Sequence, residues 1–412
     1  MKRPAIDPAL LVILAGVCAA LHVGKLPPAL PVLRDALGVT LLQAGFLLSM
    51  VQLAGMTLGL AVGLTADSFG LRRCMLLGLW TLAAASAAGG WARGANDLLV
   101  LRALEGCGLL LAALPAPSLI RKLVPMNRLS TMLGLWGAYM PFGSAVALLC
   151  GPLVMALIGW QGWWWGLSAL SAAMALGLAA GVPPDAARRS TSGAAGIGPV
   201  AQPATSVAPW PRRLRQTLTA RGPWLVALIF ALYSSQWLAV IGFLPSIYVQ
   251  AGIGGAAVGL LTALAAAVNI VGNVGSGRLL QRGLRPQTLL YAGFATMTMG
   301  ALMAFALAES QPLLRYAGML LFSMVGGMIP GTLFSLAVRL APGDDTISTT
   351  VGWMQQWSAA GQFAGPPLVA WVAGAVGGWH WTWAVTGACS AIGGLLALQM
   401  ARALRAKGKT EP

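Results

Sequence analysis

Four ionisable side chains lie inside long apolar stretches of this chain of 412 residues: His22, Lys25, Arg102 and Glu105. A charge near the middle of a bilayer costs roughly 2.5–3.5 kcal/mol on insertion scales, so residues of this kind at such positions are candidates for function. Two cations against a single acid favour an anionic ligand. The acid also offers a group that can bind and release a proton.

His22 and Lys25 are three positions apart and share one face of a predicted helix. Prolines at 27, 28 and 31 remove backbone N–H groups, which loosens this helix just beyond Lys25. A lysine at a helix irregularity inside the membrane is a candidate anion site. The alternatives are that Lys25 extends outward to lipid headgroups and that His22 has only a packing role.

Arg102 and Glu105 share a face of a later helix. They either pair with each other as a structural element, or Glu105 serves as the protonatable group of a coupled process. Glu105 is the only acid that we place inside the membrane, and the second half of the chain offers no equivalent.

Neutral polar and aromatic side chains at mid-span depth are candidates for hydrogen bonds and apolar contacts to a ligand. For each of them the alternative is a bond between helices. Asn269 and Asn273 lie one turn apart and must face protein or water. The candidates are Tyr139, Gln236, Trp237, Asn269, Asn273, Gln355 and Gln356, and Tyr233, Ser234, Ser235, Trp357 and Gln362 are of the same kind.

The elements that position these residues are membrane helices. Hydrophobic residues make up 58% of the chain and charged residues 9%, which is far from a soluble composition. Apolar runs long enough to cross the hydrocarbon layer recur along the whole sequence. We predict twelve spans at 8–33, 41–66, 73–92, 98–120, 129–158, 163–182, 223–249, 256–279, 287–308, 313–340, 346–376 and 380–404.

The spans form two sets of six. Residues 183–222, rich in Pro, Ala, Gly, Ser and Arg, separate them and are predicted to be a flexible cytoplasmic linker. Turn-forming residues recur at a constant offset of 214 positions. Pro31, Gly38, Gly45 and Gly63 return as Pro245, Gly252, Gly259 and Gly277. This offset indicates an internal duplication, so we predict bundles at 1–182 and 223–412.

The net charge of +16 does not indicate nucleic-acid binding, because the cations stand in short clusters between apolar runs. With a cytoplasmic N-terminus, 21 of the 26 Lys and Arg residues fall on the cytoplasmic side. Both termini are therefore predicted to be cytoplasmic. Tryptophans around 160–165 and 379–383 stand at predicted outer helix ends, where an interfacial belt is expected.

The sequence contains no catalytic motif, and its five cysteines are scattered without metal-ligand spacing. We therefore expect no enzyme activity, no cofactor, no metal site and no disulfide.

One loop carries a resemblance to a known family. It combines glycines with an acid and two cations between the second and third spans, in the pattern Gly63-x-x-Ala66-Asp67-x-x-Gly70-x-Arg72-Arg73. This pattern resembles the loop signature of the major facilitator superfamily. Further segments resemble motifs of helices 4, 5 and 11 of that superfamily, and they are Arg102–Gly108, Gly151-Pro152 and Gly365-Pro366.

The resemblance implies an all-α membrane fold of twelve helices in two pseudo-symmetric six-helix bundles. It also implies that Gly63, Asp67, Gly70, Arg72 and Arg73 form a cytoplasmic latch that opens during transport. The alternative for this loop is a turn that only fixes topology. The second copy of the loop has Gln281 where the acid would repeat, which argues against a second latch.

Within the superfamily, the segment Gly24–Pro31 resembles the cyanate/nitroimidazole-permease branch. We expect a monomeric secondary transporter of the inner membrane that carries a small organic or inorganic anion by alternating access, with protons as a candidate coupling ion. One alternative is a proton-driven multidrug efflux antiporter. Another is a membrane sensor or scaffold that transports nothing.

Overall fold

The computed structural model describes residues 7–185, 209–307, 311–343 and 346–407, which contain helices and turns and no strand. The helices of the first half are α1 (Pro8–Gly24), α2 (Leu26–Leu37), α3 (Leu41–Met50), α4 (Leu53–Phe69), α5 (Leu71–Gly89), α6 (Ala95–Ala113), α7 (Ala116–Leu123), α8 (Met126–Gly137) and α9 (Tyr139–Gly181). Those of the second half are α11 (Trp210–Thr219), α12 (Arg221–Gln250), α13 (Ala256–Ala267), α14 (Asn269–Gln281), α15 (Pro286–Leu302), α16 (Pro312–Gly326), α17 (Met328–Leu340), α18 (Ile347–Val376) and α19 (Thr382–Lys407).

Nine helical stretches of the described residues are long and apolar enough to cross a membrane by themselves. One of them, α9, bends at Gly159, whose φ of 73° lies in a region that glycine adopts without strain, so this helix supplies two spans. With α5 and α18, the described part of the chain holds twelve long helical segments. They coincide with the twelve predicted spans apart from a few residues at their ends, except that the predicted span 129–158 begins in α8 and the long segment begins at Tyr139.

Several spans are interrupted near their middle. The first span breaks at Lys25, between α1 and α2, where the prolines at 27 and 28 begin the second helix. The second span breaks after Met50 and its counterpart in the second half after Ala267. Likewise α6 ends at Ala113, and α16 ends 213 positions later. The matching interruptions fit the duplication that the sequence indicates.

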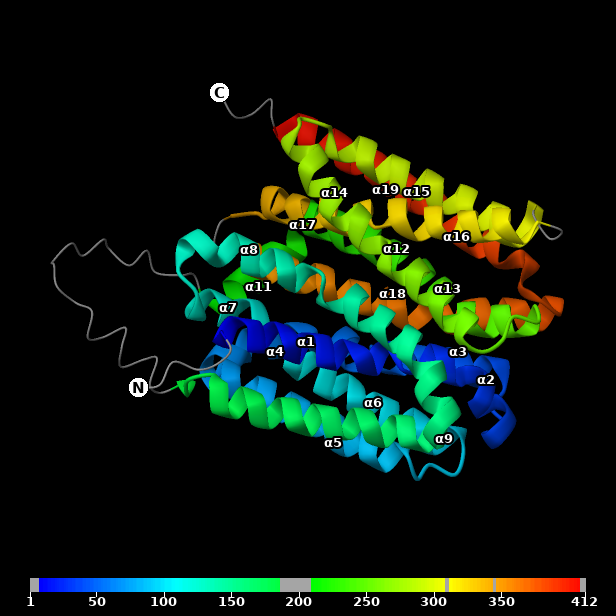
Figure 1. The fold of residues 1–412 in the computed structure, drawn as a ribbon. Coiled ribbons are helices and arrows are strands. Elements are labelled where there is room, and N and C mark those ends of the chain that lie inside the picture. The colour runs from blue at the N-terminus through cyan, green and yellow to red at the C-terminus, as the bar shows by residue number, and fades with distance from the viewer. Residues whose placement is uncertain (1–6, 186–208, 308–310, 344–345, 408–412) are drawn as a thin grey trace, which may run out of the picture.

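The helices of the first half pack mainly on one another, with α1 on α9 and α5 on both α6 and α9. In the second half, α12 packs on α18 and α19, and α15 packs on α16 and α19. Figure 1 shows the start of α1 and the end of α19 at the same end of the molecule, together with α7, α8 and α11. The prediction that this end is cytoplasmic, and the exact domain boundaries, stay predictions.

The two halves touch through α18 with α3 and α4, α13 with α9, and α12 with α2. Glycines allow the backbones to approach closely at these crossings. A Cβ atom on Gly45 would lie 2.9 Å from the backbone of Pro366, and one on Gly259 would lie 3.1 Å from the carbonyl oxygen of Leu149. Helix α4 follows the same rule, since a Cβ on Gly55 would lie 3.1 Å from that of Ala359.

The predicted linker is partly wrong. Its central residues, 186–208, lie outside the described part, but its end forms the helix α11. A proline in the first turn and good helix formers such as Arg, Leu and Gln favour this helix. The indole Nε1 of Trp224 donates a 2.8 Å hydrogen bond to the carbonyl oxygen of Leu218, which ties α11 to the beginning of α12.

Candidate functional site

The four ionisable residues predicted from the sequence form one cluster inside the first half. The carboxylate of Glu105 pairs through Oε1 with the ammonium of Lys25 and through Oε2 with Nη1 of Arg102 at 2.6 Å. All three side chains, and that of His22, are at most 1% exposed. The two predicted pairs, one on each helix, are therefore a single site.

Lys25 stands at the break between α1 and α2, and neighbouring helices surround its side chain. Its Nζ also donates to Oγ of Ser86 on α5 at 3.0 Å and lies 4.6 Å from the ring centroid of Trp164 on α9. The indole Nε1 of Trp163 donates to the carbonyl oxygen of Lys25 at 3.2 Å. Lys25 therefore does not extend to lipid headgroups.

Arg102 links α6 to two other helices. Its Nη1 donates to the carbonyl oxygen of His22 at 2.7 Å, and its Nε donates to that of Leu47 at 3.2 Å. The remaining amino group, Nη2, is buried and has no hydrogen-bond partner. Both N–H donors of this amino group are thus left for a further acceptor.

The two ring nitrogens of His22 lie in different environments. Nε2 shares a 2.7 Å hydrogen bond with Oγ of Ser171 on α9, and that hydroxyl is also 3.5 Å from Sγ of Cys18. Nδ1 lies 3.6 Å from Glu105 Oε1, too long for a hydrogen bond, and has no other partner.

The formal charges of the cluster do not cancel. Lys25 and Arg102 carry two positive charges against the single negative charge of Glu105. Removing charges from water costs several kcal/mol per ion unless partners compensate. A buried site with one excess positive charge and an unused guanidinium donor therefore favours the approach of an anion, and any proton gained by Glu105 increases that preference.

The predicted amide residues of the second half form a separate, uncharged network. Nδ2 of Asn269 donates to Oη of Tyr233 at 2.9 Å and to the carbonyl oxygen of Ser323 at 2.9 Å, and Nδ2 of Asn273 donates to Oδ1 of Asn269 at 3.0 Å. Trp237 Nε1 donates to Oγ of Ser323 at 3.2 Å. These bonds connect the helices α12, α14 and α16, which is the structural alternative weighed for the two asparagines.

The other predicted contact residues do not join the cluster. Oε1 of Gln236 accepts a 3.2 Å hydrogen bond from Ser390 on α19, and Tyr139 stacks on Trp136 with ring centroids 4.1 Å apart. Gln356 accepts a 3.1 Å bond from the backbone N–H of Leu60 in the other half.

Gln355, which precedes Gln356 in α18, is exposed. These positions bind helices together or stay at the surface.

Of the predicted latch, the structure describes the side-chain contacts of its later part, which has a turn at Gly70 with a φ of 112° that a residue other than glycine rarely adopts. The carboxylate of Asp185 accepts hydrogen bonds from the backbone N–H groups of Arg72 at 3.3 Å and Arg73 at 3.2 Å, so it caps the N-terminus of α5. Nη2 of Arg72 donates to the carbonyl oxygen of Ala179 at 2.6 Å. The side chains of residues 63–68, including Gly63 and Asp67, lie outside the described part.

Sequence reasoning missed the partners that complete these sites. Ser86 and Ser171 are single hydroxyls in apolar helices, which is a weak signal. Trp163 and Trp164 were predicted to face the membrane interface, and this is wrong because they are 6% and 1% exposed and cover Lys25. Trp165, 41% exposed, does fit an interfacial position.

Comparisons with known proteins agree with this architecture. The family model of the Major Facilitator Superfamily matches residues 12–366. The chain belongs to this superfamily and is a membrane-embedded secondary transporter. No curated protein sequence gives a significant match.

Solved structures share the fold at low sequence identity. A bacterial homologue of the human lysosomal transporter Spinster, inward-facing and unoccupied, aligns with a TM-score of 0.80 and 14% identity over 96% of each chain. Its inward-facing, occupied form gives 0.78 at 14% identity over 96% of each chain. A D-xylose-proton symporter gives 0.71 at 15% identity, covering 95% of this chain and 96% of the other. These findings give no support to the cyanate/nitroimidazole-permease branch.

Proposed function

We propose that this transporter carries a small organic or inorganic anion and that Glu105 couples the transport to protons. The supporting observation is the position of the Glu105 carboxylate between Lys25 and Arg102 in a site without solvent exposure. In effect, the protein's own carboxylate occupies the place that an anionic ligand would take. The substrate and Glu105 therefore compete for the same two cations.

This competition couples proton binding by Glu105 to binding of the anion. When Glu105 binds a proton, Lys25 and Arg102 lose their counter-charge, and the buried cations then favour an anion from solution. Once the anion binds, the excess charge returns to that of the deprotonated site. The site with both a proton and an anion bound thus carries the same net charge as the empty site. Binding of the proton alone or of the anion alone changes that net charge, so transport of the two together is favoured.

The break at Lys25 gives the site a means of exchange. Because prolines follow Lys25 at the junction of α1 and α2, backbone hydrogen bonds are missing there, and this point of the span bends more easily than an uninterrupted helix. We propose that rocking of residues 1–182 against 223–412 exposes the cluster in turn to each side. A solved structure of the same fold is named as a proton symporter, which supports proton coupling as a property of this architecture.

Within this proposal, the chain is a monomer in the inner membrane with both termini in the cytoplasm. The uneven distribution of Lys and Arg supports this orientation. Residues 183–222 connect the two halves on that side.

An efflux antiporter for amphipathic drugs is the second candidate. It is favoured by three mutually packed tryptophans where α12 begins and α18 approaches it: Trp224 lies 4.9 Å from Trp353 and 5.5 Å from Trp357 between ring centroids. The buried Nε1 of Trp353 has no hydrogen-bond partner. Such rings suit a flat or cationic organic molecule.

Transport by the purified protein in liposomes separates the two candidates. Labelled formate, acetate and cyanate are offered with and without an inward proton gradient, and a dye substrate is offered in parallel. We expect anion uptake that rises with the gradient and falls at least tenfold in Lys25→Met. Arg93→Gln, an exposed arginine of a loop between spans, is the matched control and should keep full uptake. Anion uptake unchanged in Lys25→Met, or dye transport alone, contradicts the proposal.

A further inference from the structure

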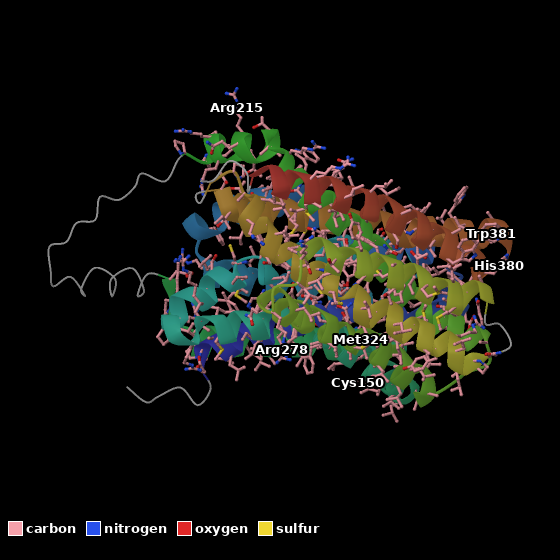
Figure 2. All side chains as sticks on the ribbon, turned by 90° about the horizontal axis from the view of Figure 1, so that it is seen from above. Cys150, Arg215, Arg278, Met324, His380 and Trp381 are labelled. Carbon is pink, nitrogen blue, oxygen red and sulfur yellow. The ribbon has the colours of Figure 1, made fainter. Side chains whose placement is uncertain are left out.

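Helix α11 carries a cluster of arginines on the outside of the bundle. Arg212 and Arg215 are exposed and Arg213 is half-buried, while Trp210 at the start of the helix is 56% exposed. The opposite face of the helix, with the buried Thr217, rests on α12 and α18. Figure 2 shows the side chain of Arg215 pointing away from the helical bundle.

These arginines have no acidic partner nearby in the sequence or in the described structure. No Asp or Glu occurs between Asp185 and Glu309. The ion pairs of the described residues involve other arginines, and the buried Nε of Arg213 lacks a hydrogen-bond partner. The guanidinium groups of α11 therefore remain available to an external acceptor.

The position of α11 decides which acceptor it meets. The helix ends one residue before α12, which begins at Arg221 and is long and apolar enough to span the membrane. The bond from Trp224 to Leu218 holds the two helices together at this point. A helix fixed to the first turn of a spanning helix must lie near the depth of the lipid headgroups. Arginines with a neighbouring tryptophan are typical of helices that bind an anionic membrane surface.

We propose that α11 is an interfacial helix that binds anionic phospholipid headgroups through Arg212, Arg213 and Arg215. Guanidinium groups donate paired hydrogen bonds to phosphate oxygens, and their charge is attracted to anionic lipids. Trp210 enters the interface beside them. The bound lipids fix the beginning of the second six spans at the membrane surface, whatever the substrate of the transporter.

Lipid binding to the purified full-length protein tests this directly. Native mass spectrometry measures the affinities for phosphatidylglycerol and phosphatidylcholine with identical acyl chains. The test variant is Arg212→Gln/Arg215→Gln, which changes exposed side chains only. The matched control, Arg34→Gln/Arg93→Gln, removes the same charge from arginines on other loops and helix ends. Arg212→Lys/Arg215→Lys keeps the charge, and gel filtration checks that each variant remains folded.

We expect the wild type to prefer phosphatidylglycerol, and this preference to fall about fivefold for each arginine removed from α11. The control pair and the lysine pair should keep most of it, and glycerol 3-phosphate should not compete. Three results would overturn the proposal: no preference in the wild type, an equal loss in the control pair, or full competition by glycerol 3-phosphate. The last would indicate a site for free phosphate compounds instead of the membrane.

Discussion

Nε2 of Gln52 donates a 3.0 Å hydrogen bond to Oε1 of Gln362, 310 positions later in the chain. Gln52 stands at the break between α3 and α4, and Gln362 lies in α18 of the other half. The bond is partly buried at a crossing where the glycines of α4 allow close contact. It is therefore a direct polar connection between the two halves.

Removing this bond should shift the balance between states of the transporter. For Gln52→Ala we expect a change of about 0.5–1.5 kcal/mol, the usual net value of one hydrogen bond, in favour of states in which α3 and α18 are apart. Hydrogen exchange of these two helices measures the change. Gln355→Ala, an exposed glutamine of the same α18, is the control. Equal exchange rates in both variants would show that the Gln52–Gln362 bond does not hold the halves together.

The buried ion pairs predict a specific pattern of stabilities. Glu105→Gln leaves Lys25 and Arg102 without a counter-charge and should destabilise the protein by about 3–5 kcal/mol. Adding Lys25→Met should recover much of the loss, because one unpaired cation is gone. Thermal unfolding of the two single variants and the double variant measures this coupling.

The surface pair between Arg128 and Asp7, at 3.0 Å, is the comparison for that experiment. Its residues are 51% and 32% exposed, so Arg128→Gln should cost less than about 1 kcal/mol. Losses from Lys25→Met and Glu105→Gln that simply add would argue against the coupling.

The proposed proton coupling predicts a separation of two activities. In Glu105→Gln the site cannot release a proton, so accumulation of the anion driven by a proton gradient should be lost. Exchange of labelled for unlabelled anion across the membrane should continue, since it requires no net proton movement. Both are measured in liposomes with the same preparation. Accumulation that persists in Glu105→Gln would place the proton site elsewhere.

Gly106, next to Glu105, lies where α6 packs closely on another helix, so a side chain at this position should disturb the site. A Cβ atom at this position would collide with the backbone of Val51 at the break between α3 and α4. Gly106→Ala should therefore push α6 outward and destabilise the protein by about 1–3 kcal/mol. At Gly94 an added Cβ would have no neighbouring atom within 4 Å, so Gly94→Ala should change the stability little. Thermal unfolding of the two variants gives the comparison, and equal stabilities would contradict the observed packing.

The cap that Asp185 forms at the N-terminus of α5 should stabilise the turn at Gly70. Asp185→Ala removes the acceptor for the first N–H groups of α5 and should cost about 1 kcal/mol locally. Hydrogen exchange of residues 71–74 should accelerate roughly fivefold. Asp97→Ala removes a comparable acceptor near the start of α6, where Oδ2 accepts a 2.9 Å bond from Arg93, and should leave α5 unchanged. Unchanged exchange at α5 in Asp185→Ala would show that the cap is dispensable.

Local properties of the sequence were enough to predict the membrane spans, the internal duplication and the weakened helix at Lys25. Hydrophobic length, glycine and proline positions act within a few residues, so they can be read without knowing which helices meet. The helix at 210–219 was missed although its first-turn proline and its helix formers are local signals, because the Pro- and Gly-rich composition of the surrounding residues indicated a linker. Its contacts with Trp224 and α18 depend on packing and could not be predicted.

The sequence by itself indicated that His22, Lys25, Arg102 and Glu105 lie inside membrane spans, where a charge is costly. Only the tertiary structure decided that they form one cluster, that Trp163 and Trp164 cover Lys25, and that Ser86 and Ser171 complete its hydrogen bonds. The physical reason is that helix periodicity fixes which residues share a face of one helix. It does not fix which faces of α1, α5, α6 and α9 meet, and that depends on the packing of the whole chain.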